Sequence, residues 1–389
     1  MASSGAVLAL VGRVFGIYEL FVVAAATGGL VVVSAAWAVS VRLKVQVTRS
    51  VRPLRVHAGE PASADLRFTN LGGRTAVLRA IDPVSTTVGA DMVLGPLQPE
   101  ERVSASYAVP TQRRGVIEIG PMTIEITDPF GLSTVRVQAA GTTAVTVYPR
   151  LDPIAPLPFS RGHDPHGAAH DSRSLGRIGE EFYALRDYSV GDDLRRVHWP
   201  STARRGRLMV RQDELPRQGR VTVLLDTRAT AHSDDSFERA VSAAASVVAT
   251  SSRKRDLVRL VTTGGRDSGF ATGRSHLESV LEFLASIQAT SRGTFQATLA
   301  NLQTASDGGA VVAVMGEAHE ADVERVTRLR GRAGALAVVR FPGAPPASTS
   351  SPGMDRGPLG QQTLEIVVPP GAAFLETWNR AVRAEAELR

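Results

Sequence analysis

The sequence contains no cysteine and only two lysines, Lys44 and Lys254. The lack of thiols excludes disulfides, thiolate metal sites and cysteine nucleophiles. Arginine therefore carries nearly all of the positive charge in a chain whose formal net charge is +6. Aromatic residues are scarce at 5%, but 43% of residues are hydrophobic and 21% are charged, which excludes a wholly disordered chain and a polytopic transporter. The 389 residues suffice for two to three domains.

Familiar catalytic motifs are also missing from the sequence. It has no G-x-S-x-G nucleophile elbow, no H-E-x-x-H zinc motif and no Walker A loop. The sequence therefore predicts no catalytic residue and no cofactor, and an enzyme is the less favoured interpretation.

The longest uncharged run lies near the N-terminus, from Leu20 to Val41. At about 1.5 Å per residue this run spans about 33 Å, which is enough for the hydrocarbon core of a bilayer. Gly5 to Tyr18 is also mostly apolar, but Arg13 interrupts it. Two arrangements stay open for an anchor in residues 1–44: a helical hairpin, or one span after an interfacial segment.

The charges around this run predict its orientation. Five basic residues follow it and none lies within the first twelve residues, so the body of the protein is expected in the cytoplasm. The basic residues are Arg42, Lys44, Arg49, Arg52 and Arg55. A signal peptide cleaved near Ala36-Trp37-Ala38 is the alternative, but these charges oppose export and a basic leader is missing.

Residues 45–150 alternate apolar and polar side chains, as in Met122-Thr123-Ile124-Glu125-Ile126. Turn signals such as Gly120-Pro121 and Asp128-Pro129 separate the short runs. This pattern predicts an antiparallel β-sandwich that serves as a spacer or docking module.

Residues 151–219 are predicted to be a linker followed by a dense charged segment. His163, His166 and His170 could bind zinc from one helical face, but Pro165 and Gly167 oppose a helix, so we expect a solvated loop.

Arginines and carboxylates alternate with aromatics from Gly179 to Arg205. An ion-paired network or protein-docking surface is favoured, because the carboxylates would repel phosphate. Nucleic-acid binding through Tyr188 and Trp199 is one alternative. A metal-assisted hydrolase is another, with acid and base chosen from Asp192, Asp193 and His198.

Residues 220–389 alternate strand and helix patterns, which predicts a doubly wound α/β domain with a mostly parallel sheet. Residues 342–360 are expected to form a flexible, low-complexity loop. Ligands of such folds bind beyond the carboxyl ends of the strands, where Asp226 is expected.

Two sets of motifs together resemble the DUF58 family. The first is Arg114-Gly115-Val116-Ile117-Glu118-Ile119-Gly120-Pro121 with Thr127-Asp128-Pro129-Phe130-Gly131-Leu132 and Val147-Tyr148-Pro149-Arg150. The second comprises Gly179, Glu181, Phe182, Arg186, Tyr188, Gly191, Asp192, Arg195, Trp199, Ala203 and Arg204. The resemblance implies a bacterial plasma-membrane protein with a C-terminal domain similar to von Willebrand factor A domains. It also implies a MoxR-type AAA+ ATPase as partner, in the assembly or maturation of envelope or protein complexes.

The likeness to A domains implies a comparison with their metal site, which begins with Asp-x-Ser-x-Ser after the first strand. The matching residues here are Asp226-Thr227-Arg228-Ala229-Thr230, and Thr294 could match a later threonine. Because a guanidinium is a permanent cation, we expect Arg228 to neutralise Asp226 and take the place of Mg²⁺. In the alternative, Asp226 only caps the next turn and Arg228 points to solvent.

Overall fold

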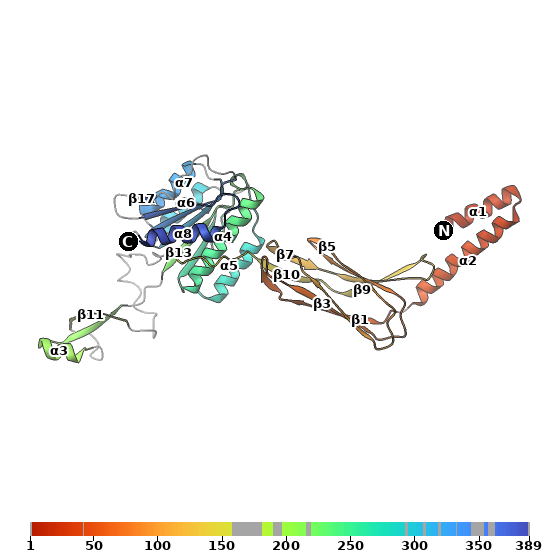
Figure 1. The fold of residues 1–389 in the computed structure, drawn as a ribbon, viewed down its shortest axis with the longest axis horizontal. Helices are drawn as coiled ribbons and strands as arrows, with labels where there is room; N and C mark the ends of the chain where they lie inside the picture. Colours follow the sequence, from red (N-terminus) through yellow and green to blue (C-terminus); the bar gives the residue numbers. More distant parts are fainter. Residues whose placement is uncertain are drawn as a thin grey trace. The chain divides into compact units, whose positions relative to one another are not determined.

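The structure is a computed structural model, and it falls into two compact units, Met1–Arg150 and Leu151–Arg389 (Figure 1). It describes residues 2–41, 43–157, 181–189, 197–214, 219–291, 295–305, 309–317, 320–331, 333–343, 354–356 and 362–387.

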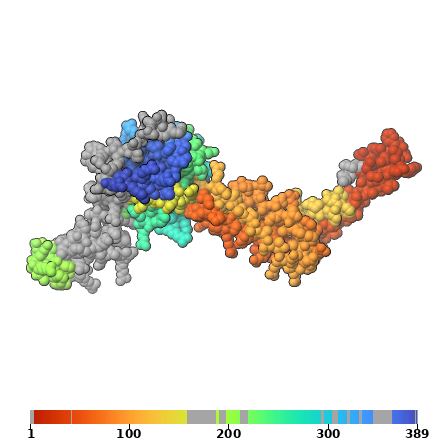
Figure 2. All heavy atoms as spheres, viewed as in Figure 1, coloured from red at the N-terminus to blue at the C-terminus, as the bar shows by residue number. Residues whose placement is uncertain are grey.

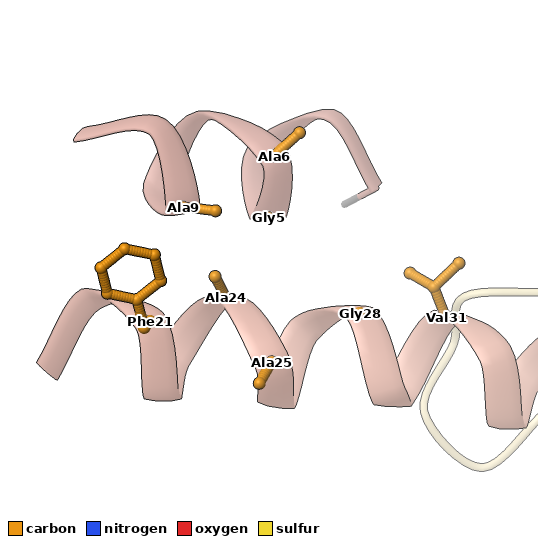
Figure 3. A pocket seen from close by; sticks show the side chains of 8 residues that line it. All are labelled: Gly5, Ala6, Ala9, Phe21, Ala24, Ala25, Gly28 and Val31. Atoms are coloured by element: carbon orange, nitrogen blue, oxygen red, sulfur yellow. The ribbon is translucent and has the colours of Figure 1, made fainter. Parts of the chain in front are cut away.

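The first unit begins with two antiparallel helices, α1 (Ala2–Phe15) and α2 (Tyr18–Ser40). The chain turns at Gly16, whose φ of 70° suits glycine. The helices approach closely because α1 presents glycines to α2. A Cβ on Gly5 would lie 2.8 Å from the Thr27 hydroxyl, and one on Gly12 would lie 3.1 Å from the Leu20 Cβ. Small residues of both helices also line a shallow apolar groove of about 410 Å³ (Figure 3).

The predicted apolar run is confirmed as a helix, since α2 is long and apolar enough to cross a bilayer. The shorter α1 packs beside it, as in the hairpin arrangement. Ser34, in the last two turns of α2, is buried against the strands that follow, and Trp37 and Val41 pack on their core.

Those strands form two facing sheets, so the predicted β-rich region is confirmed. One sheet has the order β1-β3-β6, with β1 Val45–Arg52, β3 Ser63–Asn70 and β6 Arg102–Ala108. The other has the order β2-β10-β7-β4-β8-β9, and β5 pairs with β4. Its strands are β2 Arg55–His57, β4 Leu78–Val84, β5 Thr87–Leu94, β7 Gly115–Ile119, β8 Met122–Thr127, β9 Thr134–Ala140 and β10 Thr143–Tyr148. Alternate side chains such as Phe68 and Ile124 meet between the sheets and form the core.

The second unit contains an open six-stranded sheet in the order β14-β13-β15-β16-β18-β17. All neighbours are parallel except β17, which runs antiparallel to β18. The strands are β13 Arg220–Leu225, β14 Leu257–Thr262, β15 Ala310–Met315, β16 Ala335–Arg340, β17 Met354–Arg356 and β18 Gln362–Val367. The predicted doubly wound α/β fold is thus confirmed at the level of a parallel sheet with helices.

Helices cover this sheet on both faces. Apolar residues of α6 and α7 enter one core with alternate residues of the strands, and α4 packs on β13, β14 and β15. The helices are α4 Asp234–Arg253, α5 Arg274–Ser286, α6 Phe295–Ala305, α7 Glu320–Thr327 and α8 Phe374–Glu387. The interpretation of residues 342–360 as only a loop was wrong at one place. Met354–Arg356 pairs as edge strand β17, because its backbone N–H and C=O groups can bond to those of β18 whatever the side chains are.

The second unit also holds a two-stranded antiparallel sheet of β11 (Glu181–Asp187) and β12 (Met209–Glu214). The short helix α3 (Trp199–Arg205) lies between these strands in sequence. It ends at Gly206, which adopts the left-handed conformation with a φ of 66°.

Candidate functional site

Asp226 follows β13 at the carboxyl end of the parallel sheet and is completely buried. The strand order reverses direction between β13 and β15, and open α/β sheets bind ligands at such a position. The Asp226 carboxylate accepts hydrogen bonds from the Arg228 Nε at 3.0 Å and Nη2 at 2.7 Å. It also accepts the Arg228 backbone N–H at 3.1 Å and the Thr263 hydroxyl at 3.1 Å. Its oxygens are therefore occupied by protein donors.

Arg228 joins a second carboxylate to this cluster. Its Nη2 lies 2.9 Å from the Oδ2 of Asp322, a buried residue of α7. The guanidinium carbon stacks 4.8 Å from the centre of the Phe295 ring, and only 22% of the Arg228 side chain is exposed. The hydrogen bond to Asp226 raises the pKa of Arg228 above its usual value against the effect of burial, and Asp322 adds to the rise. We call Asp226, Arg228, Thr263 and Asp322 the arginine-filled cluster.

The arginine-filled cluster differs in two members from the site suggested by sequence. Thr230 lies exposed in the 3₁₀ turn Ala229–Ala231, and Thr294 falls outside the described residues. The hydroxyl on Asp226 comes instead from Thr263, directly after β14. The second carboxylate, Asp322, belongs to the first turn of α7. The metal-site motif would place an aspartate at the end of β15 instead, so the motif did not indicate Asp322.

His232 packs behind the arginine-filled cluster. Its Nε2 lies 2.9 Å from the Asp226 carbonyl oxygen, which the ring can contact only as an N–H donor. A Cβ on Gly316 would come within 2.6 Å of the His232 Nδ1, so only glycine fits beside the ring. Burial lowers the pKa of His232, and Arg228 lowers it further, although the Asp226 carboxylate partly opposes both.

We expect acid to destabilise the α/β domain through His232. An unfolded histidine has a pKa of about 6.5, whereas the folded pKa is lower, so the unfolded state takes up the proton first. Stability should therefore fall as the pH falls below about 6.5 and level off below the folded pKa. In urea titrations across this range, His232→Gln should remove this part of the slope. An unchanged slope in the variant would exclude His232 as its source.

The signature residues from Gly179 to Arg204 are spread over β11 and α3. Glu181, Phe182 and Arg186 lie in β11, and the Tyr188 backbone N–H donates to the Leu208 carbonyl at 2.9 Å. Trp199, Ala203 and Arg204 lie in α3, where all three are exposed, and the Trp199 side chain is 65% exposed. Gly179, Gly191, Asp192, Asp193 and Arg195 lie outside the described residues, as do His163, His166 and His170.

His198, the other candidate for acid–base chemistry, holds the start of α3. Its Nδ1 lies 2.9 Å from the Ser201 hydroxyl, and its carbonyl accepts the Thr202 N–H at 3.0 Å. Its own N–H donates to the Met209 carbonyl at 2.8 Å. These contacts give His198 a role in joining α3 to β12. Over the described ranges, no three side chains of the His, Cys, Asp or Glu type gather as a metal site.

A family model described as "Protein of unknown function DUF58" matches residues 184–340. No curated protein matches the sequence. Among solved structures, the CARDB domain of the PF1109 protein from Pyrococcus furiosus is 16% identical, with 27% of this chain and 92% of that chain covered and a TM-score of 0.21. The complex of Zinc 2-glycoprotein and prolactin inducible protein from human seminal plasma is 10% identical, with coverages of 28% and 98% and a TM-score of 0.21. A beta-glucosidase from Listeria innocua is 12% identical, with coverages of 25% and 16% and a TM-score of 0.17.

Proposed function

We propose that this chain, which belongs to the DUF58 family through residues 184–340, is a membrane-anchored protein-interaction module that faces the cytoplasm. In this proposal the α1–α2 hairpin holds the protein in the plasma membrane of a bacterium, and the second unit binds a partner protein. The resemblance described above suggests a MoxR-type AAA+ ATPase as that partner and the assembly or maturation of envelope or protein complexes as the process.

The observation that carries the proposal is the arginine-filled cluster. A metal-dependent enzyme needs an open coordination position for water or substrate. Here the guanidinium of Arg228 lies on the Asp226 oxygens that a cation would need, at 2.7 to 3.2 Å. An ion pair of this kind stabilises a scaffold and leaves no activated water. This supports a binding role for this end of the sheet over metal-assisted catalysis at Asp226.

The topology supports a domain similar to von Willebrand factor A domains. Five parallel strands are covered by helices on both faces, and Asp226 follows the first of them, as the resemblance implies. If the domain is of this class, its metal site is degenerate, with Arg228 where the middle serine would stand.

Helix α3 is the docking element in this proposal. It presents Trp199, Arg204 and Arg205 to solvent, and buried tryptophan and arginine side chains dominate the binding energy of many interfaces. Two arginines at its C-terminal end favour an acidic surface on the partner.

We expect Arg204→Glu to weaken binding of the full-length protein to a MoxR-type AAA+ ATPase from the same organism. Reversal of one interfacial charge replaces attraction by repulsion and should reduce the association rate most at low salt. Surface plasmon resonance with the detergent-solubilised chain would measure both rates. Trp199→Ala should instead speed dissociation.

Arg274→Glu is the matched control, because the Arg274 side chain on α5 is 91% exposed and lies outside α3. Equal losses in Arg274→Glu and Arg204→Glu would indicate nonspecific electrostatics. No binding by the unmodified chain would reject this partner.

A further inference from the structure

The end of the sandwich that meets α2 carries an exposed aromatic side chain. Loop 128–133 joins β8 to β9, and within it Phe130 is 56% exposed. Single exposed apolar residues are common on protein surfaces, so a role for Phe130 has to be argued from its position. The position is defined by the contact between the loop and α2.

Asp128 fixes the loop on α2. Its carboxylate accepts a hydrogen bond from the buried Ser34 hydroxyl of α2. The same carboxylate accepts the backbone N–H groups of Leu132 and Ser133, both at 2.7 Å, and of Phe130 at 3.2 Å. In Figure 2 the yellow residues of this region lie against the red end of α2. Phe130 is thus held in an ordered loop beside Ser34.

The aromatic residues of α2 indicate where Ser34 lies in a bilayer. Tyr18 and Trp37 are 19 residues apart in the helix, which at 1.5 Å per residue is about 28 Å. This matches the thickness of the hydrocarbon core, about 30 Å, and Tyr and Trp are enriched at its two boundaries. Trp37 also packs on the sandwich core. If α2 spans the bilayer between these two aromatic residues, Ser34 lies about 4.5 Å inside the boundary at Trp37, and the attached loop 128–133 reaches the edge of the hydrocarbon core.

The loop that follows β3 at this end of the sandwich also exposes an apolar side chain, that of Leu71. The Leu71 N–H donates to the carbonyl of Lys44 at 2.7 Å, and the Leu71 side chain is 60% exposed. Lys44 is therefore beside Leu71 in space, Arg74 lies three residues further along the chain, and both basic residues are exposed. Apolar side chains beside basic ones are typical of surfaces that bind anionic lipid headgroups.

We propose that this end of the β-sandwich is a second membrane contact, in which Phe130 enters the lipid interface beside α2 and Leu71 approaches the headgroups. The bilayer covers the exposed side chains, and the Ser34–Asp128 hydrogen bond sets their depth. This inference rests on the membrane anchoring in the proposed function.

The absence of cysteine allows a direct test by single-site labelling of the full-length protein. An environment-sensitive fluorophore would be attached to one cysteine at a time, in the variants Phe130→Cys, Leu71→Cys, Val88→Cys and Val22→Cys. Each labelled protein would then be reconstituted into vesicles of phosphatidylcholine and phosphatidylglycerol. Val88 is the matched control, because it is 92% exposed on β5, at the opposite end of the same sheet. Val22 reports on the anchor itself. Lipids with a spin label near the headgroup would serve as quenchers.

We expect the labels at 130 and 22 to shift to the blue and lose most of their emission to the quencher, with none lost at 88. Phe130→Asp should also reduce quenching of a label at 71. Quenching at 22 with position 130 behaving like 88 would overturn the inference and leave the anchor intact. Exposure of position 22 to water would instead contradict the anchor and the proposed function.

Discussion

Replacement of Arg228 by methionine is expected to destabilise the α/β domain by about 3 kcal/mol, because it leaves the buried Asp226 carboxylate without a cation and Asp322 with only the partly exposed Arg325. Asp226 is completely buried and Asp322 nearly so, and both accept hydrogen bonds from the same guanidinium. Hydrogen exchange on peptides of β13 and α7, measured in the full-length protein, would give the change in the free energy of local opening.

Arg325→Met is the control for this experiment. Arg325 also pairs with Asp322, at 3.0 Å, but 45% of its side chain is exposed. Its loss should cost less than about 1 kcal/mol, the usual worth of an exposed ion pair. Equal effects of the two substitutions would contradict the view that Arg228 is the cation of a buried site.

Arg228→Ser adds a test of metal replacement. It places a hydroxyl where the middle serine of an A-domain motif would stand, so millimolar Mg²⁺ should restore part of the lost stability of this variant. The unmodified protein should not respond to Mg²⁺. Tight Mg²⁺ binding by the unmodified protein in isothermal titration, abolished by Asp226→Asn, would show that Arg228 does not occupy the site.

Replacement of Asp82 by alanine is expected to destabilise the β-sandwich by about 4 kcal/mol, since the loss of one member of a buried ion pair strands the other charge. Asp82, on β4, accepts the Arg49 Nη1 at 2.6 Å and the Tyr107 hydroxyl at 2.7 Å. Arg49 and Tyr107 belong to the opposite sheet, so this network ties the two sheets together. Burial, helped by the hydrogen bond to Asp82, raises the pKa of Tyr107 well above its usual value.

The exposed pair Arg79–Asp91, which joins β4 to the adjacent strand β5, is a control on the same strand as Asp82. It has the same chemistry, with hydrogen bonds of 2.9 and 2.5 Å, but 54% and 43% of the two side chains are exposed. Asp91→Ala should therefore leave the unfolding transition of the sandwich unchanged. Urea unfolding followed by hydrogen exchange in β4 and β8 would compare the variants. An equally small change for Asp82→Ala would show that the buried network contributes little.

The sequence predicted the structure best where a single hydrophobic period or a neighbouring opposite charge determines it. The apolar run and the alternating strands each repeat a simple pattern: the run from Leu20 to Val41 corresponds to α2, and Met122 to Ile126 corresponds to β8. Arg228 beside Asp226 could be recognised because the two lie two positions apart, within reach of one turn.

Contacts between distant parts of the chain could not be predicted from the sequence. Thr263 and Asp322 reach Asp226 and Arg228 only through the order of strands and helices in space. Likewise, Ser34 and Asp128 are 94 residues apart, and neither residue type alone suggests the other as its partner. The Asp128-Pro129-Phe130-Gly131 motif could be recognised, but its attachment to the anchor could not.

The passage from α2 to the sandwich is short. Ser40 ends the helix and Val45 begins β1, so even a fully extended chain would separate them by less than about 18 Å. If α2 is embedded in a bilayer, this short linker keeps the sandwich close to the membrane surface. A soluble partner would then have to come to the membrane surface to meet this protein.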